Sequence, residues 1–173
     1  MLRRHRAETV ICLGDSFHDR AAGQRLSEPD AAFLPDLVAS HEWIWIAGNH
    51  DPASIFDLGG RILRELAMGE IVFRHQAAPA TANGEVSGHF HPMTTVRLRV
   101  GRLAGRCFVS DGRRLVLPAF GAFAGGLDIF DPAIVRLFPD GFPVHLIGRD
   151  RVVAVSPTRL APSSQVGLSH KSR

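Results

Sequence analysis

Two runs of large apolar residues, at positions 9–13 and 43–46, each lead directly into a glycine and then into polar side chains. Both runs are continuous rather than alternating, so they predict strands that are buried on both faces. The polar segments that follow, residues 14–19 and 48–52, then lie at the carboxyl ends of these strands. Open α/β sheets place their ligands at such ends, so we expect a functional site where the two segments meet.

The segment between the two strands predicts a helix over residues 27–41. Ser27 can cap its first turn, and apolar residues recur at helical spacing, while Pro35 predicts a kink or a later start. A strand, a helix and a strand in this order predict a βαβ unit with parallel strands and a right-handed crossover. The chain is therefore expected to belong to the α/β class.

The pattern of strand, glycine and polar residues recurs further along the chain. Residues 60–68 predict a short helix, and residues 70–74 predict a strand that ends at His75. Residues 85–87 predict another strand, which opens into the polar segment 88–92. Each of these strands thus ends in histidine.

Beyond residue 94 the apolar residues alternate with polar ones, which is typical of half-exposed antiparallel strands. The pattern predicts strands over residues 96–101, 106–109, 114–118, 144–147 and 151–155, and Asp111-Gly112 predicts a hairpin turn. We interpret the glycine-dense segment 119–127 as a tightly packed loop near the site. Residues 1–157 are then one domain, and residues 158–173 are expected to be a disordered tail.

Composition places the chain among soluble globular proteins, because 45% of its 173 residues are hydrophobic and 21% are charged. No apolar run approaches the roughly 20 residues that span a membrane. The basic N-terminus is not followed by the apolar h-region of a secretory signal, so a cytoplasmic location is expected. Cys12 and Cys107 are interpreted as buried reduced thiols rather than as a disulfide.

The net charge of +3 owes much to arginines at positions 3–6, 97–106 and 113–114. Solvated strand faces are the favoured explanation of these clusters. Contact with nucleic acid is the alternative, although aromatic residues do not alternate with the arginines as they do in single-strand-binding surfaces.

The polar residues at the strand ends are of types that bind metals, namely Asp15, Asn49, His50, His75, His89 and His91. A mixture of imidazole, carboxylate and amide oxygen suits borderline metals such as Mn, Fe, Zn or Ni. In a regular strand the rings of His89 and His91 would share one face, but Gly88 and Pro92 allow a bend that directs them to two different ions.

These residues resemble the motifs of the calcineurin-like metallophosphoesterase superfamily in order, spacing and strand context. The motifs are Gly14-Asp15, Gly48-Asn49-His50-Asp51, His75 and Gly88-His89-Phe90-His91. A narrower resemblance covers nearly the whole chain and includes residues 86–92, 117–121 and 125–127. It is to the bacterial ligase-associated DNA damage response endonucleases of the PdeM type, which are encoded beside a DNA ligase, a helicase and an exonuclease-like protein.

The resemblance implies a four-layer α/β/β/α sandwich with two divalent metal ions, of which manganese is the favoured choice. It implies that Asp15 bridges the ions, that Asn49, His75 and His89 complete one site, and that His91 belongs to the other. His50 would protonate the leaving oxygen and Asp51 would orient it, while a metal-bound hydroxide attacks phosphorus in line.

One motif of the superfamily is missing, because its pattern begins with Asp-x-His on a strand upstream of Gly14-Asp15. The sandwich would therefore lack its first strand, and the site that includes His91 would lack two ligands. Three explanations are open: a mis-assigned start or truncation, which is favoured; an enzyme that works with one ion; and a degenerate remnant.

The leading functional hypothesis is a metal-dependent phosphodiesterase or endonuclease that acts on DNA in bacterial repair. A phosphomonoesterase or nucleotide phosphatase is the alternative enzyme, since the same site can serve either reaction. A non-catalytic partner of a ligase or helicase is the alternative outside enzymes.

Overall fold

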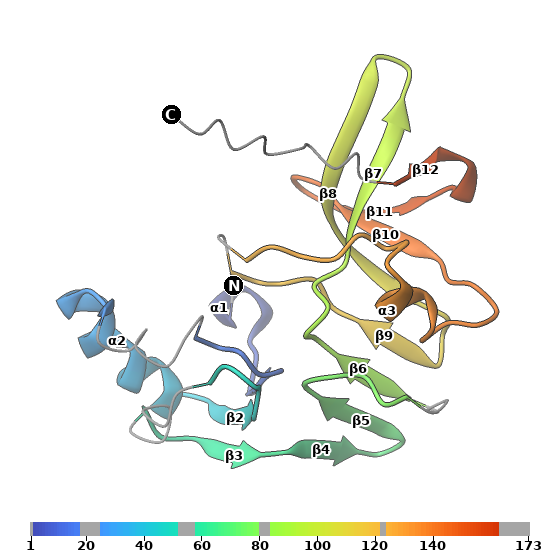
Figure 1. The fold of residues 1–173 in the computed structure, drawn as a ribbon. Coiled ribbons are helices and arrows are strands. Elements are labelled where there is room, and N and C mark those ends of the chain that lie inside the picture. Colours follow the sequence, from blue (N-terminus) through green and yellow to red (C-terminus); the bar gives the residue numbers. More distant parts are fainter. Residues whose placement is uncertain (1, 18–24, 52–57, 80–83, 122–123, 163–173) are drawn as a thin grey trace, which may run out of the picture.

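The computed structural model describes residues 2–17, 25–51, 58–79, 84–121 and 124–162. Within these ranges the chain forms two β-sheets, one parallel and one mixed, with few helices (Figure 1). This arrangement confirms the predicted α/β class. None of the described helices is both long and apolar enough to cross a membrane.

The smaller sheet contains the predicted βαβ unit. Its order is β1-β2-β3, and both pairings are parallel. The strands are β1 (Thr9–Cys12), β2 (Glu42–Ile46) and β3 (Arg61–Leu63), and helix α2 (Glu28–Ala39) connects the first two. The Ser27 hydroxyl accepts a hydrogen bond from the Asp30 amide at 3.3 Å and caps α2 as predicted, and the helix continues through Pro35.

Burial differs between the two strands that were expected to be alike. Residues 43–46 of β2 are all buried, as their continuous hydrophobicity predicts, whereas every residue of β1 is only half-buried. Among the described strands β1 pairs only with β2, so one of its edges and part of its surface are left uncovered. The prediction that β1 is fully buried was therefore wrong.

The larger sheet has nine strands, with the order β11-β10-β8-β9-β6-β5-β4 and with β7 joining β8 to β12. Its strands are β4 (Glu65–Met68), β5 (Ile71–Arg74), β6 (Glu85–Ser87), β7 (Met93–Leu98), β8 (Gly101–Ser110), β9 (Arg114–Val116), β10 (Val144–Ile147), β11 (Val152–Val155) and β12 (Leu160–Ala161). The shorter helices are α1 (Leu2–His5), α3 (Pro132–Val135) and the 3₁₀ helix Pro157–Arg159.

The helix predicted over residues 60–68 is not formed. These residues form β3 and β4 instead, and the chain crosses from one sheet to the other at Arg64. Residues 61–68 contain several good helix formers, but pairing with β2 on one side and with β5 on the other overrides that preference.

Two other predictions about chain segments need correction. Residues 158–162 were assigned to a disordered tail, but β12 pairs with Thr95 and Val96 of β7; residues 163–173 lie outside the described part. Residues 119–127 were interpreted as tightly packed, yet those that are described are exposed or half-exposed, and Phe120 is 87% exposed.

A buried ion pair fixes the centre of the larger sheet. Glu85 of β6 is 1% exposed, and its carboxylate lies 2.7 Å from Nε of Arg114 on β9 and 3.4 Å from Nε of Arg74 on β5. Arg114 also donates hydrogen bonds to the carbonyls of Ala78 and Leu137. The interpretation of Arg114 as a solvated charge was therefore wrong.

Both cysteines are free, as predicted, but Cys12 was expected to be buried and is only half-buried. Cys107 is fully buried in the core of the larger sheet, and burial raises the pKa of its thiol to about 12. Burial likewise raises the pKa of Cys12 to about 11.

Candidate metal centre

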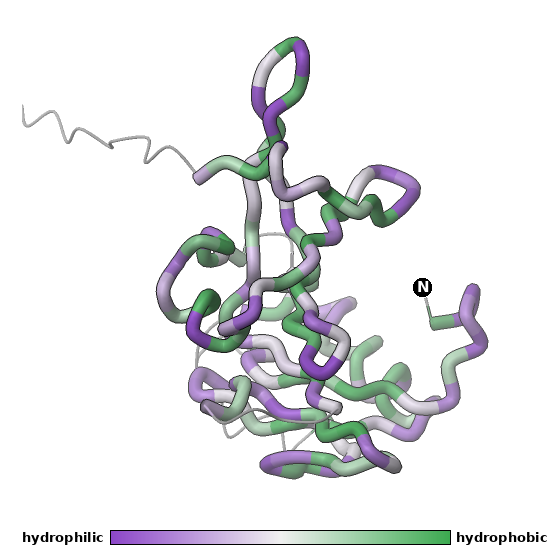
Figure 2. Tube along the Cα trace, turned by 90° about the vertical axis from the view of Figure 1, so that its right-hand side faces the viewer, coloured by the Kyte–Doolittle hydropathy of each residue, from purple (hydrophilic) through white to green (hydrophobic). Residues whose placement is uncertain are grey.

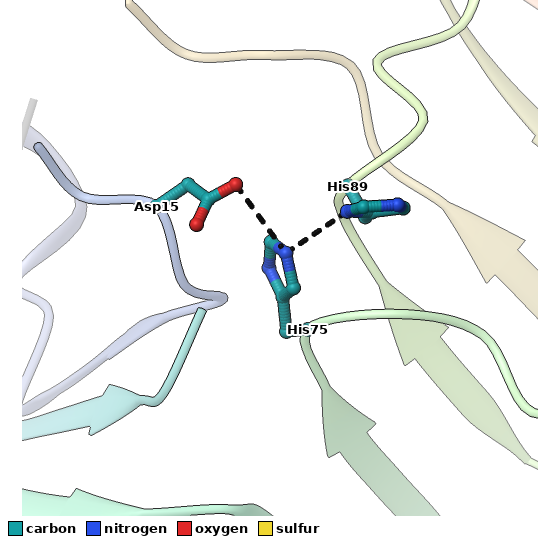
Figure 3. Close-up of side chains that lie close together, drawn as sticks. All are labelled: Asp15, His75 and His89. Atoms are coloured by element: carbon teal, nitrogen blue, oxygen red, sulfur yellow. Dashed lines mark hydrogen bonds and ion pairs between the residues drawn. The ribbon is translucent and has the colours of Figure 1, made fainter. Parts of the chain in front are cut away.

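Asp15, His75 and His89 lie together at the junction of the two sheets (Figure 3). Each has one donor atom within 4.8 Å of the donor atoms of the other two. They follow β1, β5 and β6, respectively. Because β5 and β6 are parallel and Arg74 is opposite Ser87, the residues after these strands emerge side by side.

The Nε2 atom of His75 is the point on which the donor atoms converge. It lies 2.8 Å from Oδ1 of Asn49, 3.0 Å from Nδ1 of His89 and 3.4 Å from Oδ2 of Asp15. The other ring nitrogen, Nδ1, is 2.8 Å from the carbonyl oxygen of Leu13, to which it can only donate. In a neutral imidazole Nε2 then presents a lone pair.

This arrangement fits a cation. Two of the atoms around that lone pair, from Asn49 and Asp15, are themselves oxygens that offer electron pairs. Electron pairs that face one another repel, and a positive ion at their centre reverses the sign of each interaction. A ring whose second nitrogen is held by a backbone carbonyl is also the usual arrangement of metal-binding histidines.

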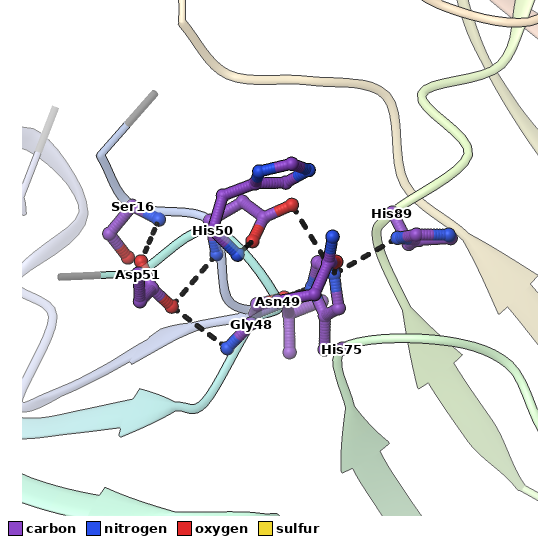
Figure 4. Close-up of polar contacts among 9 residues, drawn as sticks. Ser16, Gly48, Asn49, His50, Asp51, His75 and His89 are labelled. Atoms are coloured by element: carbon purple, nitrogen blue, oxygen red, sulfur yellow. Dashed lines mark hydrogen bonds and ion pairs between the residues drawn. The ribbon is translucent and has the colours of Figure 1, made fainter. Parts of the chain in front are cut away.

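Asp51 links the loop after β1, which carries Asp15, to the loop after β2, which carries Asn49 (Figure 4). Its Oδ2 accepts hydrogen bonds from the backbone amides of Asp15 at 2.9 Å and Gly48 at 2.8 Å, and its Oδ1 accepts from Ser16 at 2.7 Å. In return, Oδ1 of Asp15 accepts from the amide of His50 at 2.8 Å. These four bonds form what we call the carboxylate clasp, and they leave Oδ2 of Asp15 turned toward His75.

Three residues of the loops at the site have positive φ, a backbone conformation that few non-glycine residues adopt. Asp15, His89 and His91 have φ of 49°, 64° and 49°, in the left-handed region. Non-glycine residues held there are characteristic of functional sites. Glycine is required nearby, because a Cβ on Gly48 would overlap the amide and carboxylate of Asp15, and one on Gly14 would overlap the His75 ring.

His50 and Asp51 were predicted to act together. Asp51 was expected to orient the His50 ring, but among the described residues its carboxylate bonds to backbone amides of both loops. The exposed ring of His50 lies beside the ligands (Figure 4). Asp51 thus takes part in the clasp, to which His50 contributes its backbone amide, and the role of Asp51 in orienting the His50 ring stays a prediction.

His91 is not among the three residues whose donor atoms form the cluster, which are Asp15, His75 and His89. Burial lowers the pKa of His91; the Asp15 carboxylate and a hydrogen bond with the Gly125 backbone oppose this change, so His91 lies near both. The pKa of His89 is also lowered, first by burial and then by His75. A lowered pKa keeps both rings neutral at neutral pH, which is the form that binds metals.

Comparison with solved structures finds that the chain is similar to Pseudomonas putida nuclease MPE, known from a crystal structure. The TM-score is 0.66 and the sequence identity is 28% over 89% of this chain and 74% of the nuclease. Family models and curated proteins gave no match. The chain is thus similar in fold and in part of its sequence to a nuclease.

An open groove of about 580 Å³ adjoins the cluster. Its lining includes Asn49, His75 and His89 from the site, together with Arg64, Glu65 and Arg74. Arg64 was not predicted to be part of the site, because it lies in the segment that was expected to be a helix. Its place in the groove depends on the crossover between the sheets, for which the sequence offers no local signal.

Proposed function

We propose that the chain is a metal-dependent phosphodiester hydrolase in which Asp15, Asn49, His75 and His89 hold a divalent ion. The observation that carries the proposal is the convergence of three donor atoms on Nε2 of His75, within 3.4 Å. The similarity to a nuclease supports phosphodiesters as the substrate class.

The donor set favours a borderline metal, and manganese is our first choice over iron, zinc or nickel. Such an ion supplies Lewis acidity toward phosphate oxygens and toward water when it is bound. We propose His91 and Asp15 as the protein's contribution to a second ion. In the alternative in which this protein works with one ion, that ion binds to the cluster around His75.

The chain's own residues have distinct tasks in this proposal. The carboxylate clasp holds Asp15 in place, and the Leu13 carbonyl fixes the tautomer of His75. The exposed ring of His50 is free to reach a bound substrate and to protonate its leaving oxygen. The groove beside the cluster receives the phosphodiester, with Arg64 to attract its negative charge.

The substrate that we favour is DNA, cut by an endonuclease in bacterial repair. The proposal extends to a four-layer α/β/β/α sandwich, to a cytoplasmic location and to work beside a DNA ligase, a helicase and an exonuclease. These finer statements rest on the sequence motifs, with support from the nuclease similarity.

The test is hydrolysis by protein first stripped with EDTA and then given manganese. Single-stranded DNA, bis-nitrophenyl phosphate and nitrophenyl phosphate represent a natural diester, an activated diester and a monoester. His75→Ala should abolish manganese binding measured by calorimetry. His50→Ala should bind manganese normally yet lose about 10²- to 10⁴-fold in rate on DNA.

Comparison of the rates on the two diesters distinguishes loss of the His50 proton donor from a general loss of active-site structure. A nitrophenolate leaves without a proton, so His50→Ala should slow that substrate much less than DNA. His5→Ala, which replaces an exposed histidine of α1, is the matched control and should change neither rate. Preference for the monoester would instead indicate a phosphatase, and absence of manganese binding would refute the metal centre.

A further inference from the structure

The hairpin of β7 and β8 projects beyond the rest of the molecule (Figure 1). Residues 97–104, at and near its tip, are all exposed, and Val100 in the turn is 96% exposed. From the side, polar and apolar segments alternate around this tip (Figure 2). We call residues 97–106 the arm.

The arm concentrates positive charge. It contains four arginines and no acidic residue in ten positions, whereas the net charge of the whole chain is only +3. The remainder of the chain is therefore close to neutral, at 3 − 4 = −1. A surface of this kind attracts polyanions, and the attraction is local rather than a property of the entire molecule.

The pairing of the strands places two of these charges directly opposite each other. Arg97 of β7 is the partner of Arg102 of β8, so both side chains lie on one face of the hairpin. Like charges at directly opposed positions destabilise an antiparallel pair. Two guanidinium groups on one face also present adjacent positive charges and several N–H donors to a phosphate.

The same face leads back toward the metal centre. Arg102 and Arg106 are four residues apart on β8, about 13 Å along the strand, a span of a few nucleotides. Arg106 is the partner of Met93, two residues after His91. It also donates hydrogen bonds to the carbonyls of Ala119 and Gly121 and so fixes the loop at the base of the arm.

We propose that the arm is a docking surface for the phosphate backbone of a nucleic acid, which it directs from its tip toward the metal centre. The inference deepens the proposed nuclease function and rests on it for the identity of the polyanion. Arg97, Arg99 and Arg102 make the phosphate contacts, and Arg106 holds the base of the arm in place.

The experiment measures binding of a fluorescein-labelled single-stranded oligonucleotide by anisotropy in EDTA, which prevents cleavage. The arm variant R97S/R99S/R102S is compared with R136S/R149S/R151S, which removes the same charge from exposed positions elsewhere. With about 0.7 counterions released per single-strand contact, the arm variant should lower the salt slope by about 2 and weaken binding about a hundredfold at 0.1 M salt.

The control variant should change binding far less, and R97K/R99K/R102K should restore most of it because phosphate contacts need mainly charge. Equal losses in the arm and control variants would overturn the proposal, since they would show only a net-charge effect. Unchanged DNA binding in the arm variant, together with a change in its oligomeric state, would overturn it in favour of a contact between protein chains.

Hydrolysis of bis-nitrophenyl phosphate keeps this inference distinct from the proposed function. The arm variant should hydrolyse that small diester at the rate of the unmodified chain, because the substrate does not reach the arm. If the unmodified chain binds the oligonucleotide through its arm but hydrolyses no diester, the nuclease function is refuted and the docking surface is still supported.

Discussion

Replacement of Asp51 by asparagine distinguishes two roles of this residue. Its carboxylate either holds the two loops together through the clasp or orients the His50 ring for catalysis. The carboxylate accepts hydrogen bonds from the amides of Asp15, Ser16 and Gly48, at distances of 2.7 to 2.9 Å. Asparagine has nearly the same shape but only one acceptor oxygen. That oxygen can serve the amides of Asp15 and Gly48, and the side-chain NH₂ group then faces the amide of Ser16, so this bond is lost.

The free energy follows from the bonds that remain. Hydrogen bonds to a charged acceptor contribute about 1.5 kcal/mol each at the low end of their range, which suits amides at the edge of a site. Three such bonds amount to about 4.5 kcal/mol. The asparagine side chain would keep two neutral bonds at about half that strength, or about 1.5 kcal/mol. The variant D51N should therefore lose about 3 kcal/mol of unfolding free energy, equivalent to a fall in Tm of about 6 to 12 °C.

Denaturant unfolding in EDTA tests this value without any contribution from metal. Asp150→Asn, at an exposed turn, is the matched control and should stay within about 0.5 kcal/mol of the unmodified chain. Manganese affinity of D51N should fall by about 10- to 100-fold, because Asp15 loses its support. If D51N instead unfolds and binds manganese like the unmodified chain but loses turnover as His50→Ala does, Asp51 acts through the imidazole and the clasp is refuted.

Three further changes test other parts of the structure. Glu85→Gln removes the negative charge beside the buried guanidinium group of Arg114 and should cost about 3 to 5 kcal/mol of unfolding free energy; Glu65→Gln, whose side chain is 59% exposed, should cost less than about 1 kcal/mol. Gly48→Ala forces a methyl group against Asp15 and should weaken manganese binding in calorimetry more than it lowers Tm; an unchanged affinity would contradict the close approach. Cys107, with its pKa raised to about 12, stays a protonated thiol at pH 8 and should react with iodoacetamide far more slowly in the native than in the unfolded chain.

The sequence was sufficient to predict the cluster because each ligand follows a strand with a clear local signal. Continuous hydrophobicity and a following glycine mark the ends of β1 and β2, and parallel pairing brings those ends together. The same logic holds for His75 and His89, which follow paired parallel strands. In each case the information lies within a few neighbouring residues.

The features that sequence analysis missed depend on partners that are distant in the chain. Residues 61–68 have helical propensity, and only pairing with β2 and β5 reveals them as strands. The hydrogen bonds that Asp51 accepts in the clasp were not predicted, because two of them reach 35 and 36 residues back along the chain. Arg114 looked like a surface charge until β9 placed it against Glu85. Local sequence patterns do not indicate which distant residues will become partners in the fold.

The carboxylate clasp also explains how the site keeps an unfavourable backbone. Left-handed conformations of non-glycine residues cost on the order of 1 to 3 kcal/mol each, and Asp15 is in one, directly after a glycine with φ of 84°. Asp51 accepts three hydrogen bonds from backbone amides, and Asp15 accepts one from the His50 amide. Together these four hydrogen bonds offset a cost of that size. All four lie within the loops and need no metal, so the ligands are held in place before an ion binds. An ion that finds its ligands already placed does not have to bend the backbone, and its binding free energy is available for affinity.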